Sequence, residues 1–212
     1  MPQIIITGNT DIIDNFMDKG TPTNNNGGST TLVIGNAFGG AFIYRGLLKN
    51  VFTAIPSGVV INSAQLQLKI SSVNANNGGT LKAYRSKRAW EEASSTWNNW
   101  KTGNTWTTAG AGSTANDRES TELGSVVIPA STPSAGDIIT MNLDSALIQE
   151  FIDGIFTNNG YVLKMNAETG LDGYTFHSSE AAVADNRPKI VVNYSFPQNG
   201  SPMFFGGGVT LG

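Results

Sequence analysis

The sequence predicts an all-β fold, an antiparallel β-sandwich of the jelly-roll type with one short α-helix. Two observations carry this prediction. Short apolar or alternating runs recur along the chain between turns rich in Gly, Asn and Pro, which is the spacing typical of a sandwich. A single segment shows the three-to-four-residue spacing of a helix. With 212 residues and no cysteine, the chain fits one sizeable domain that can bury a core without disulfides.

Residues 59–70 give the clearest strand signal. Leu66, Leu68 and Ile70 point one way and the residues between them point the other, as in a half-buried antiparallel strand. The sequence ANNGG then predicts a hairpin into residues 80–85. The other runs of strand character are residues 3–6, 10–16, 31–35, 41–52, 121–128, 138–143, 161–166, 174–177 and 189–194. The last of these alternates little, which predicts a central strand.

Residues 144–156 are the predicted helix. Asp144 is a natural N-cap, because its side chain can accept hydrogen bonds from the first free N–H groups. Gly154 is expected to end the helix. Five apolar side chains fall on one face and should pack against the sheets, namely Leu147, Ile148, Phe151, Ile152 and Ile155.

Composition argues against two classes of partner. Only 14% of the residues are charged and the net charge is −3, with no basic stripe, so we expect no nucleic-acid binding. No apolar run reaches the ~18 residues that a membrane helix needs, so we expect no membrane partner. The N-terminus lacks the basic region of a secretory signal. We therefore expect a cytoplasmic protein or one that leaves the cell by another route, such as a virus particle.

The chain changes character after Phe196. We therefore divide it into a sandwich domain, residues 1–196, and a Gly/Phe-rich tail, residues 197–212. An aromatic pair before three glycines is expected to be tied down by a partner subunit rather than left in solvent. The expected partner contacts are Met203, Phe204, Phe205, Val209 and Leu211.

Several segments occur together in a characteristic order. They include TNNNGGSTTLVIGN, LKAYRSKRAWEEASSTWNNWKTGNTW, GYTFHSSEA and DNRPKIVVNY. Across residues 4–195 the chain resembles the DNRLRE-domain family of β-sandwich modules, which is related to alginate- and other carbohydrate-binding modules. The resemblance implies a non-catalytic jelly roll of a kind found in secreted, surface and virion proteins. Trp100 and Lys101 stand where the family commonly has a basic residue and a proline.

All four tryptophans lie between residues 90 and 106, in a segment that could hold one helical turn. Such a cluster either plugs the core or forms a binding surface. We expect Trp90 and Trp97 to pack. Trp100 is the candidate for an exposed contact, so the possible glycan contacts are Trp100, Asn98, Asn99 and Lys101.

Cofactors and catalysis have weak signals. Two acidic groups could hold a structural calcium ion, although the expected state is no cofactor and no metal. They are Asp11, Asp14 and Asp18, and Asn116, Asp117 and Glu119. The lone histidine, His177, lies in a strand pattern and no catalytic motif surrounds it, so we expect no enzyme. Arg187 is expected to pair with Asp185 or Glu180 and to fix the last strand.

Two functions from different classes remain. The first is a structural role, as a jelly-roll subunit of a large assembly, most simply a bacteriophage decoration, cement or fibre protein located in the virion. Its partners would be copies of itself or capsid proteins. The alternative is an extracellular or cell-surface carbohydrate-binding module that recognises a polysaccharide through aromatic side chains with Asn, Lys and Arg donors.

Overall fold

A computed structural model describes residues 2–37, 42–74 and 77–197. The regular elements of these parts are thirteen β-strands, one α-helix and one short 3-10 helix. The strands are β1 (Gln3–Thr7), β2 (Ile12–Asp18), β3 (Thr31–Ala37), β4 (Phe42–Asn50), β5 (Val60–Val73), β6 (Gly79–Ser86), β7 (Asn99–Lys101), β8 (Asn104–Thr105), β9 (Arg118–Ile128), β10 (Ile138–Leu143), β11 (Tyr161–Met165), β12 (Tyr174–His177) and β13 (Lys189–Ser195). The helices are α1 (Ser145–Ile152) and η1 (Ala184–Asn186). The all-β prediction with one helix is confirmed.

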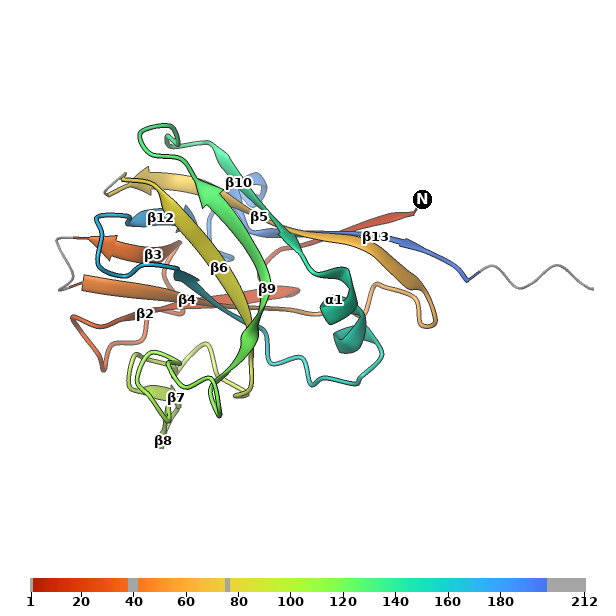
Figure 1. Cartoon of the computed structure of the whole chain (residues 1–212), viewed down its shortest axis with the longest axis horizontal. Coiled ribbons are helices and arrows are strands. Elements are labelled where there is room, and N and C mark those ends of the chain that lie inside the picture. Colours follow the sequence, from red (N-terminus) through yellow and green to blue (C-terminus); the bar gives the residue numbers. More distant parts are fainter. Residues whose placement is uncertain (1, 38–41, 75–76, 198–212) are drawn as a thin grey trace, which may run out of the picture.

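The predicted open jelly-roll sandwich is wrong, because the main sheet closes on itself. Its strands follow the order β5–β10–β9–β6–β11–β4–β3–β12, and β12 pairs with β5 again, which makes an eight-stranded barrel (Figure 1). The length of β5 explains the closure. Along one edge it pairs first with β13 and then, from Ile70 onward, with β12, while β10 occupies the other edge. A two-residue alternation reveals which face of a strand is buried, but not which strands meet at its edges.

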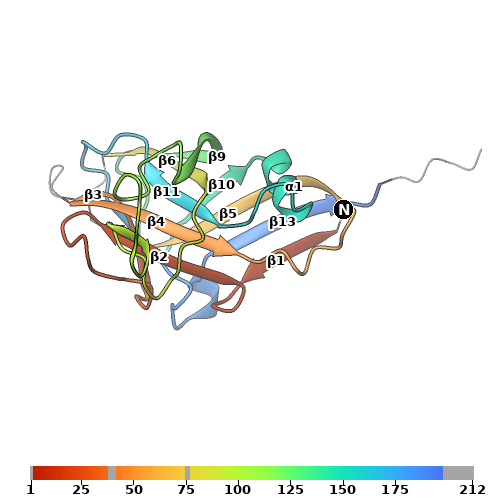
Figure 2. The ribbon, with the colours of Figure 1, turned by 90° about the horizontal axis from the view of Figure 1, so that it is seen from below.

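Three strands of the main sheet lie outside the ring. β13 pairs with β5, and β1 pairs with β13, so that these strands extend the sheet beyond the barrel (Figure 2). β2 pairs with β4 alone. β13 therefore has two neighbours, as its uniformly apolar sequence predicted.

Two apolar clusters stabilise the fold. The larger one fills the barrel and includes Leu66, Leu68 and Ile70, each at most 1% exposed, so the predicted inward face of β5 is confirmed. The smaller cluster lies on the opposite face of β2, β4 and β11, under the tryptophan segment. The long irregular tryptophan segment therefore covers the face of these strands that points away from the barrel interior.

The helix is confirmed but shorter than predicted. The Asp144 carboxylate accepts hydrogen bonds from the N–H groups of Ala146 and Leu147, at 2.9 and 3.1 Å. The helix ends at Ile152, and Gly154 follows with a φ of +71°. Ile155 therefore lies past the last turn and is 75% exposed, which contradicts its predicted place on the buried face.

The tryptophan segment forms no helix. A single turn closes where the Ser95 N–H donates to the Glu91 carbonyl oxygen at 2.8 Å, and β7 and β8 then pair as a short hairpin.

The predicted partner contacts of the tail, Met203 to Leu211, lie outside the described residues. Within the described ranges, no helix is long and apolar enough to span a bilayer.

Candidate functional site

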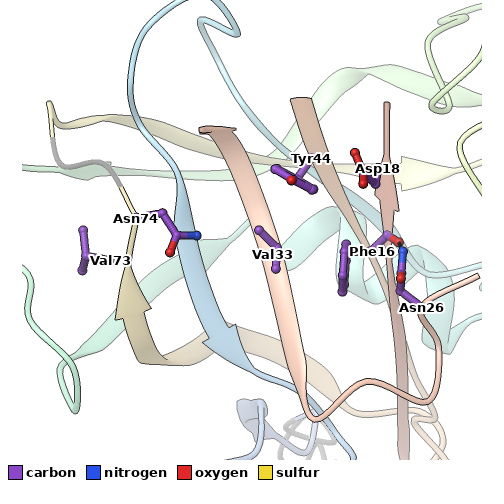
Figure 3. A pocket seen from close by; sticks show the side chains of 7 residues that line it. All are labelled: Phe16, Asp18, Asn26, Val33, Tyr44, Val73 and Asn74. Carbon is purple, nitrogen blue, oxygen red and sulfur yellow. Dashed lines mark hydrogen bonds between the residues drawn. The ribbon is translucent and has the colours of Figure 1, made fainter. Parts of the chain in front are cut away.

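A groove of about 590 Å³ opens beside β2, β3 and β4 (Figure 3). This size lies within the usual range of small-ligand sites. Residues from distant parts of the sequence meet here, because β4 pairs with both β2 and β3, and β12 pairs with both β3 and β5. The lining residues are Phe16 and Asp18 of β2, Asn26 of the following loop, Val33 of β3, Tyr44 of β4, Val73 of β5 and the adjoining Asn74.

Two aromatic rings form one side of the groove. Phe16 and Tyr44 meet edge to face, with ring centroids 6.1 Å apart and an interplanar angle of 65°. Phe16 also packs against the core, which holds the pair in place. Partial burial raises the pKa of the Tyr44 phenol, and the Asp18 carboxylate, which is opposite it in register, adds to the increase. The hydroxyl therefore stays protonated at neutral pH and can donate a hydrogen bond.

Asp18 is the acidic group of the groove. Its Oδ1 accepts a hydrogen bond from the Gly20 N–H and its Oδ2 accepts one from the Thr21 hydroxyl, both at 2.7 Å. These bonds hold the carboxylate in a fixed orientation, while its remaining lone pairs can accept hydrogen bonds from a ligand. It is the one carboxylate among the described residues that line the groove, so no acid–base pair of the kind that glycosidases use is formed there.

Two amides complete the polar side. Asn26 donates from Nδ2 to the Phe16 carbonyl oxygen at 2.9 Å, and Asn74 donates from Nδ2 to the Thr175 hydroxyl at 2.9 Å. Each bond uses the amide nitrogen and fixes how the side chain is turned. The groove thus combines an aromatic face with preoriented amide and carboxylate groups, an arrangement suited to a polyhydroxylated ligand.

The tryptophans are mostly structural. Trp90, Trp97 and Trp106 are at most 8% exposed, so the predicted packing of the first two is confirmed. Trp100 is half-buried, and the Arg88 guanidinium and the Lys101 ammonium lie 5.7 and 4.8 Å from its ring centroid.

The predicted glycan contacts Asn98 to Lys101 lie together in and next to β7. The main chain of Asn98 is bound on both sides, to Pro22 and to Trp106. Asn99 and Thr96 bond to each other through their main chains, and the Asn99 N–H also donates to the Thr96 hydroxyl at 3.1 Å. This surface is a second candidate, separate in sequence from the groove.

Three carboxyl groups meet where β2, the tryptophan segment and the β12–β13 connection converge. Asp14 is 2% exposed and its Oδ2 accepts a hydrogen bond from the Ser179 N–H at 2.7 Å. Burial raises the pKa of Asp14 to about 8, and the charges of Glu180 and Glu92 act in the same direction. Ser179 in turn donates from its hydroxyl to Glu180 at 2.7 Å. Because Asp14 is buried, we interpret these three carboxyl groups as structural: their contacts hold β2, the tryptophan segment and the β12–β13 connection together.

The first predicted calcium group is not brought together. Asp14 and Asp18 lie four residues apart along β2, roughly 13 Å by the rise of a strand, and their carboxylates bind Ser179 in one case and Gly20 and Thr21 in the other.

In the second group, the Asp117 carboxylate already accepts three main-chain N–H bonds, from Thr107, Thr108 and Ser113. It also pairs with Arg88 at 3.5 Å. No cluster of three or more His, Cys, Asp or Glu placed to hold a metal occurs within the described residues.

The remaining predictions concern the region after β12. Burial and the nearby Lys69 lower the pKa of His177, while the neighbouring Ser178 donates its hydroxyl proton to the Ser29 carbonyl oxygen at 2.6 Å. The predicted ion pair of Arg187 is wrong. Its Nε donates to the Ala181 carbonyl oxygen at 2.8 Å, and Asp185 pairs with Lys189 instead.

Sequence reasoning missed the groove, apart from Asp18, which it placed in a calcium group. Phe16 and Tyr44 stand 28 positions apart in strands of ordinary β-type sequence, and no motif links them to Asn74. The available signal is that Phe16 is close to the polar loop DKGTPTNNNGGST.

The fold and the groove define the chain as an all-β barrel domain with a small-ligand-sized groove in its wall. More particularly, it belongs to the family described as the Disaggregatase related repeat domain, whose family model matches residues 14–192. The match runs from β2 to β13 and so includes every strand of the ring. A search of curated proteins found no match. The resemblance to DNRLRE domains stays a prediction, since the family match does not bear on it.

Proposed function

We propose that the chain is a non-catalytic carbohydrate-binding module and that its ligand lies in the groove of Figure 3. The observation that carries the proposal is the juxtaposition of Tyr44, Asp18 and the two amides in one groove of about 590 Å³. A sugar ring offers an apolar C–H face that can lie against the Tyr44 ring. Its hydroxyl groups can bond to the carboxylate and amides that neighbouring hydrogen bonds already orient.

Preorientation supports binding because it reduces the entropy lost when the ligand is held. Asp18, Asn26 and Asn74 each make a hydrogen bond within the protein that restricts the side chain before a ligand arrives.

The proposal is tested by affinity gel electrophoresis in a panel of neutral soluble polysaccharides. The wild-type protein should be retarded by at least one of them. Replacing Tyr44 by Ala should weaken binding by roughly three- to tenfold, the value of one aromatic contact, and Asn74→Ala should weaken it as well. Tyr44→Phe should retain more binding than Tyr44→Ala, because it keeps the ring and loses only the hydroxyl.

Trp100→Ala is the matched control, because it removes a half-buried aromatic side chain from the second candidate surface. It should leave retardation unchanged. Loss of binding in Trp100→Ala but not in Tyr44→Ala would move the site to β7, and absence of retardation in the whole panel would refute the proposal for those polysaccharides.

The structural role in a virion stays a prediction. Its main support is the tail with Phe204 and Phe205, which lies outside the described residues. The groove instead lies within residues 14–192, the part that the family shares, and for that reason we favour ligand binding over assembly.

A further inference from the structure

Four cationic side chains gather on the outer face of β4, β11, β6 and β9, away from the barrel interior. Lys164 of β11 is directly opposite Lys82 of β6 in the antiparallel register. Arg45 precedes Gly46, which pairs with Leu163, and so it flanks Lys164 on the other side. We call these three residues the cation row. Like charges directly opposite each other destabilise a sheet unless something compensates for them.

The carboxylates around the row compensate for only part of this charge. Glu168 binds Arg45 through two hydrogen bonds of 2.7 Å and lies 3.7 Å from Lys164. Glu122 pairs with Lys82. Arg45 also donates from Nη1 to the Gly110 carbonyl oxygen at 2.6 Å, so all three of its guanidinium nitrogens have hydrogen-bond partners. Lys164 also donates from Nζ to the Met165 carbonyl oxygen at 2.9 Å. An ammonium group has three N–H donors, so each lysine still keeps at least one that these contacts do not use.

Arg118 adds a fourth cation beside the row. Its guanidinium lies 4.3 Å from the centroid of the Tyr84 ring, and Tyr84 follows Lys82 by two residues on β6. One nitrogen, Nη1, donates to the Glu119 carbonyl oxygen at 3.1 Å. Nε is buried and has no hydrogen-bond partner among the described residues. A buried donor of a charged group without a partner is costly, so the charge of Arg118 is incompletely compensated within the protein.

Electrostatics point to the same deficit of negative charge. Burial lowers the pKa of Lys164, and the charges of Arg45, Arg118 and Lys82 act in the same direction against Glu168. Burial likewise lowers the pKa of Arg118. Two further carboxylates are near: Asp172, which accepts a hydrogen bond from the Asn36 N–H, and Asp117, which is saturated by main-chain N–H groups. The protein as a whole is acidic, with a net charge of −3, so this local excess of cations is not a consequence of composition.

We infer that Lys82, Lys164 and Arg118 form an anion-binding site for an oxyanion group, a carboxylate or a sulfate. The two ammonium groups would supply charge-assisted hydrogen bonds to its oxygens, and the Arg118 guanidinium beside them would add positive charge. The source of the oxyanion is either a free inorganic ion or an acidic substituent on a polymer. This site shares no residue with the groove and does not depend on the function proposed for the groove.

The test compares dextran sulfate, dextran and sodium sulfate as probes of the whole chain at constant ionic strength. Calorimetry should detect binding of dextran sulfate by the wild-type protein, while dextran reports any contribution from the groove. The double variant Lys82→Gln/Lys164→Gln should lose about tenfold or more in affinity for dextran sulfate. Removing two opposed like charges should leave the fold intact, which a melting curve without ligand checks.

Lys19→Gln/Lys49→Gln is the matched control, since it removes the same charge elsewhere and should bind as the wild type does. Arg118→Gln is a second, independent variant and should also weaken binding. Stabilisation of the wild-type protein by sodium sulfate, absent in the double variant, would assign a free ion as the source. The inference fails if neither dextran sulfate nor sodium sulfate binds the wild-type protein. It also fails if the double variant binds dextran sulfate as tightly as the Lys19→Gln/Lys49→Gln control does.

Discussion

Asp14 shows how a single buried carboxyl can couple stability to pH. It lies sealed between β2, the tryptophan segment and the β12–β13 connection, and burial raises its pKa from 3.8 to about 8. The folded protein therefore binds this proton more tightly than the unfolded chain does. The stabilisation is complete below the unfolded value of 3.8 and is lost as the pH rises toward 8.

Asp14→Asn should remove this dependence. The amide keeps an oxygen to accept the Ser179 N–H bond and carries no charge at any pH. Urea unfolding at pH 5, 6.5 and 8 should show the wild-type protein losing stability relative to the variant, by on the order of a few kcal/mol across the range. Asp11→Asn, at an exposed position, is the control. Parallel curves for Asp14→Asn and the wild-type protein would contradict the prediction.

Three neighbours also bear on the ionisation of Asp14. Glu92 accepts a hydrogen bond from the Asp14 N–H at 3.2 Å and belongs to the tryptophan segment. Glu180 and Ser179 belong to the connection between β12 and β13. Deprotonation of Asp14 would place a buried negative charge beside both glutamates. The contacts of β2 with the tryptophan segment and with the β12–β13 connection should therefore both weaken above pH 8.

At the scale of elements, helix α1 depends on its first turn. Asp144 accepts two N–H bonds that would otherwise be unsatisfied, and its charge lies near the positive end of the helix dipole. Asp144→Ala should lower the free energy of unfolding by about 1 kcal/mol, measured by urea denaturation.

Asp153→Ala is the matched control for this substitution. It removes a carboxylate from the other end of the same helix, where negative charge is unfavourable, although it also removes a bond from Gln149. Its effect on stability should be smaller than that of Asp144→Ala. Equal losses in the two variants would show that the cap does not stabilise the helix.

The strands and the helix cap could be predicted from the sequence because their signals are local. Leu66, Leu68 and Ile70 alternate with polar residues within a single strand, and Asp144 is next to the turn it caps. The ring could not be predicted in this way. It depends on β12 pairing with the far end of β5, between residues such as Ile70 and Phe176 that no local pattern connects.

The groove was missed for the same reason. Phe16 and Tyr44 meet through the pairing of β2 with β4, while Asn26 and Asn74 lie in the loops that follow β2 and β5, so no local pattern connects the four residues. The burial of Trp90 and Trp97, by contrast, could be predicted, because large apolar side chains near strand ends are usually packed. The short end of the helix was misjudged because Ile155 continues the apolar spacing after the backbone has already turned at Gly154.

At the scale of the whole molecule, the ring and the strands outside it should differ in stability. β5 has strand partners along both edges, whereas β1 pairs with β13 alone among the described strands. Native-state hydrogen exchange should therefore be slowest for the amides of β5 between residues 64 and 70. The amides on the free edge of β1 should exchange first. Protection of β1 equal to that of β5 would contradict this ranking.

Closure of the ring between β5 and β12 also sets an order of events during synthesis. Ile70 and Phe176 pair although they are 106 residues apart. At typical rates of translation the ribosome needs roughly 5 to 20 s to make that stretch. Both edges of β5 wait for partners that are made later, because β10, β12 and β13 all follow it in the sequence, and its Leu66–Leu68–Ile70 face has no completed core to cover it during this time. We therefore expect β5 to be a segment of the growing chain that a chaperone protects.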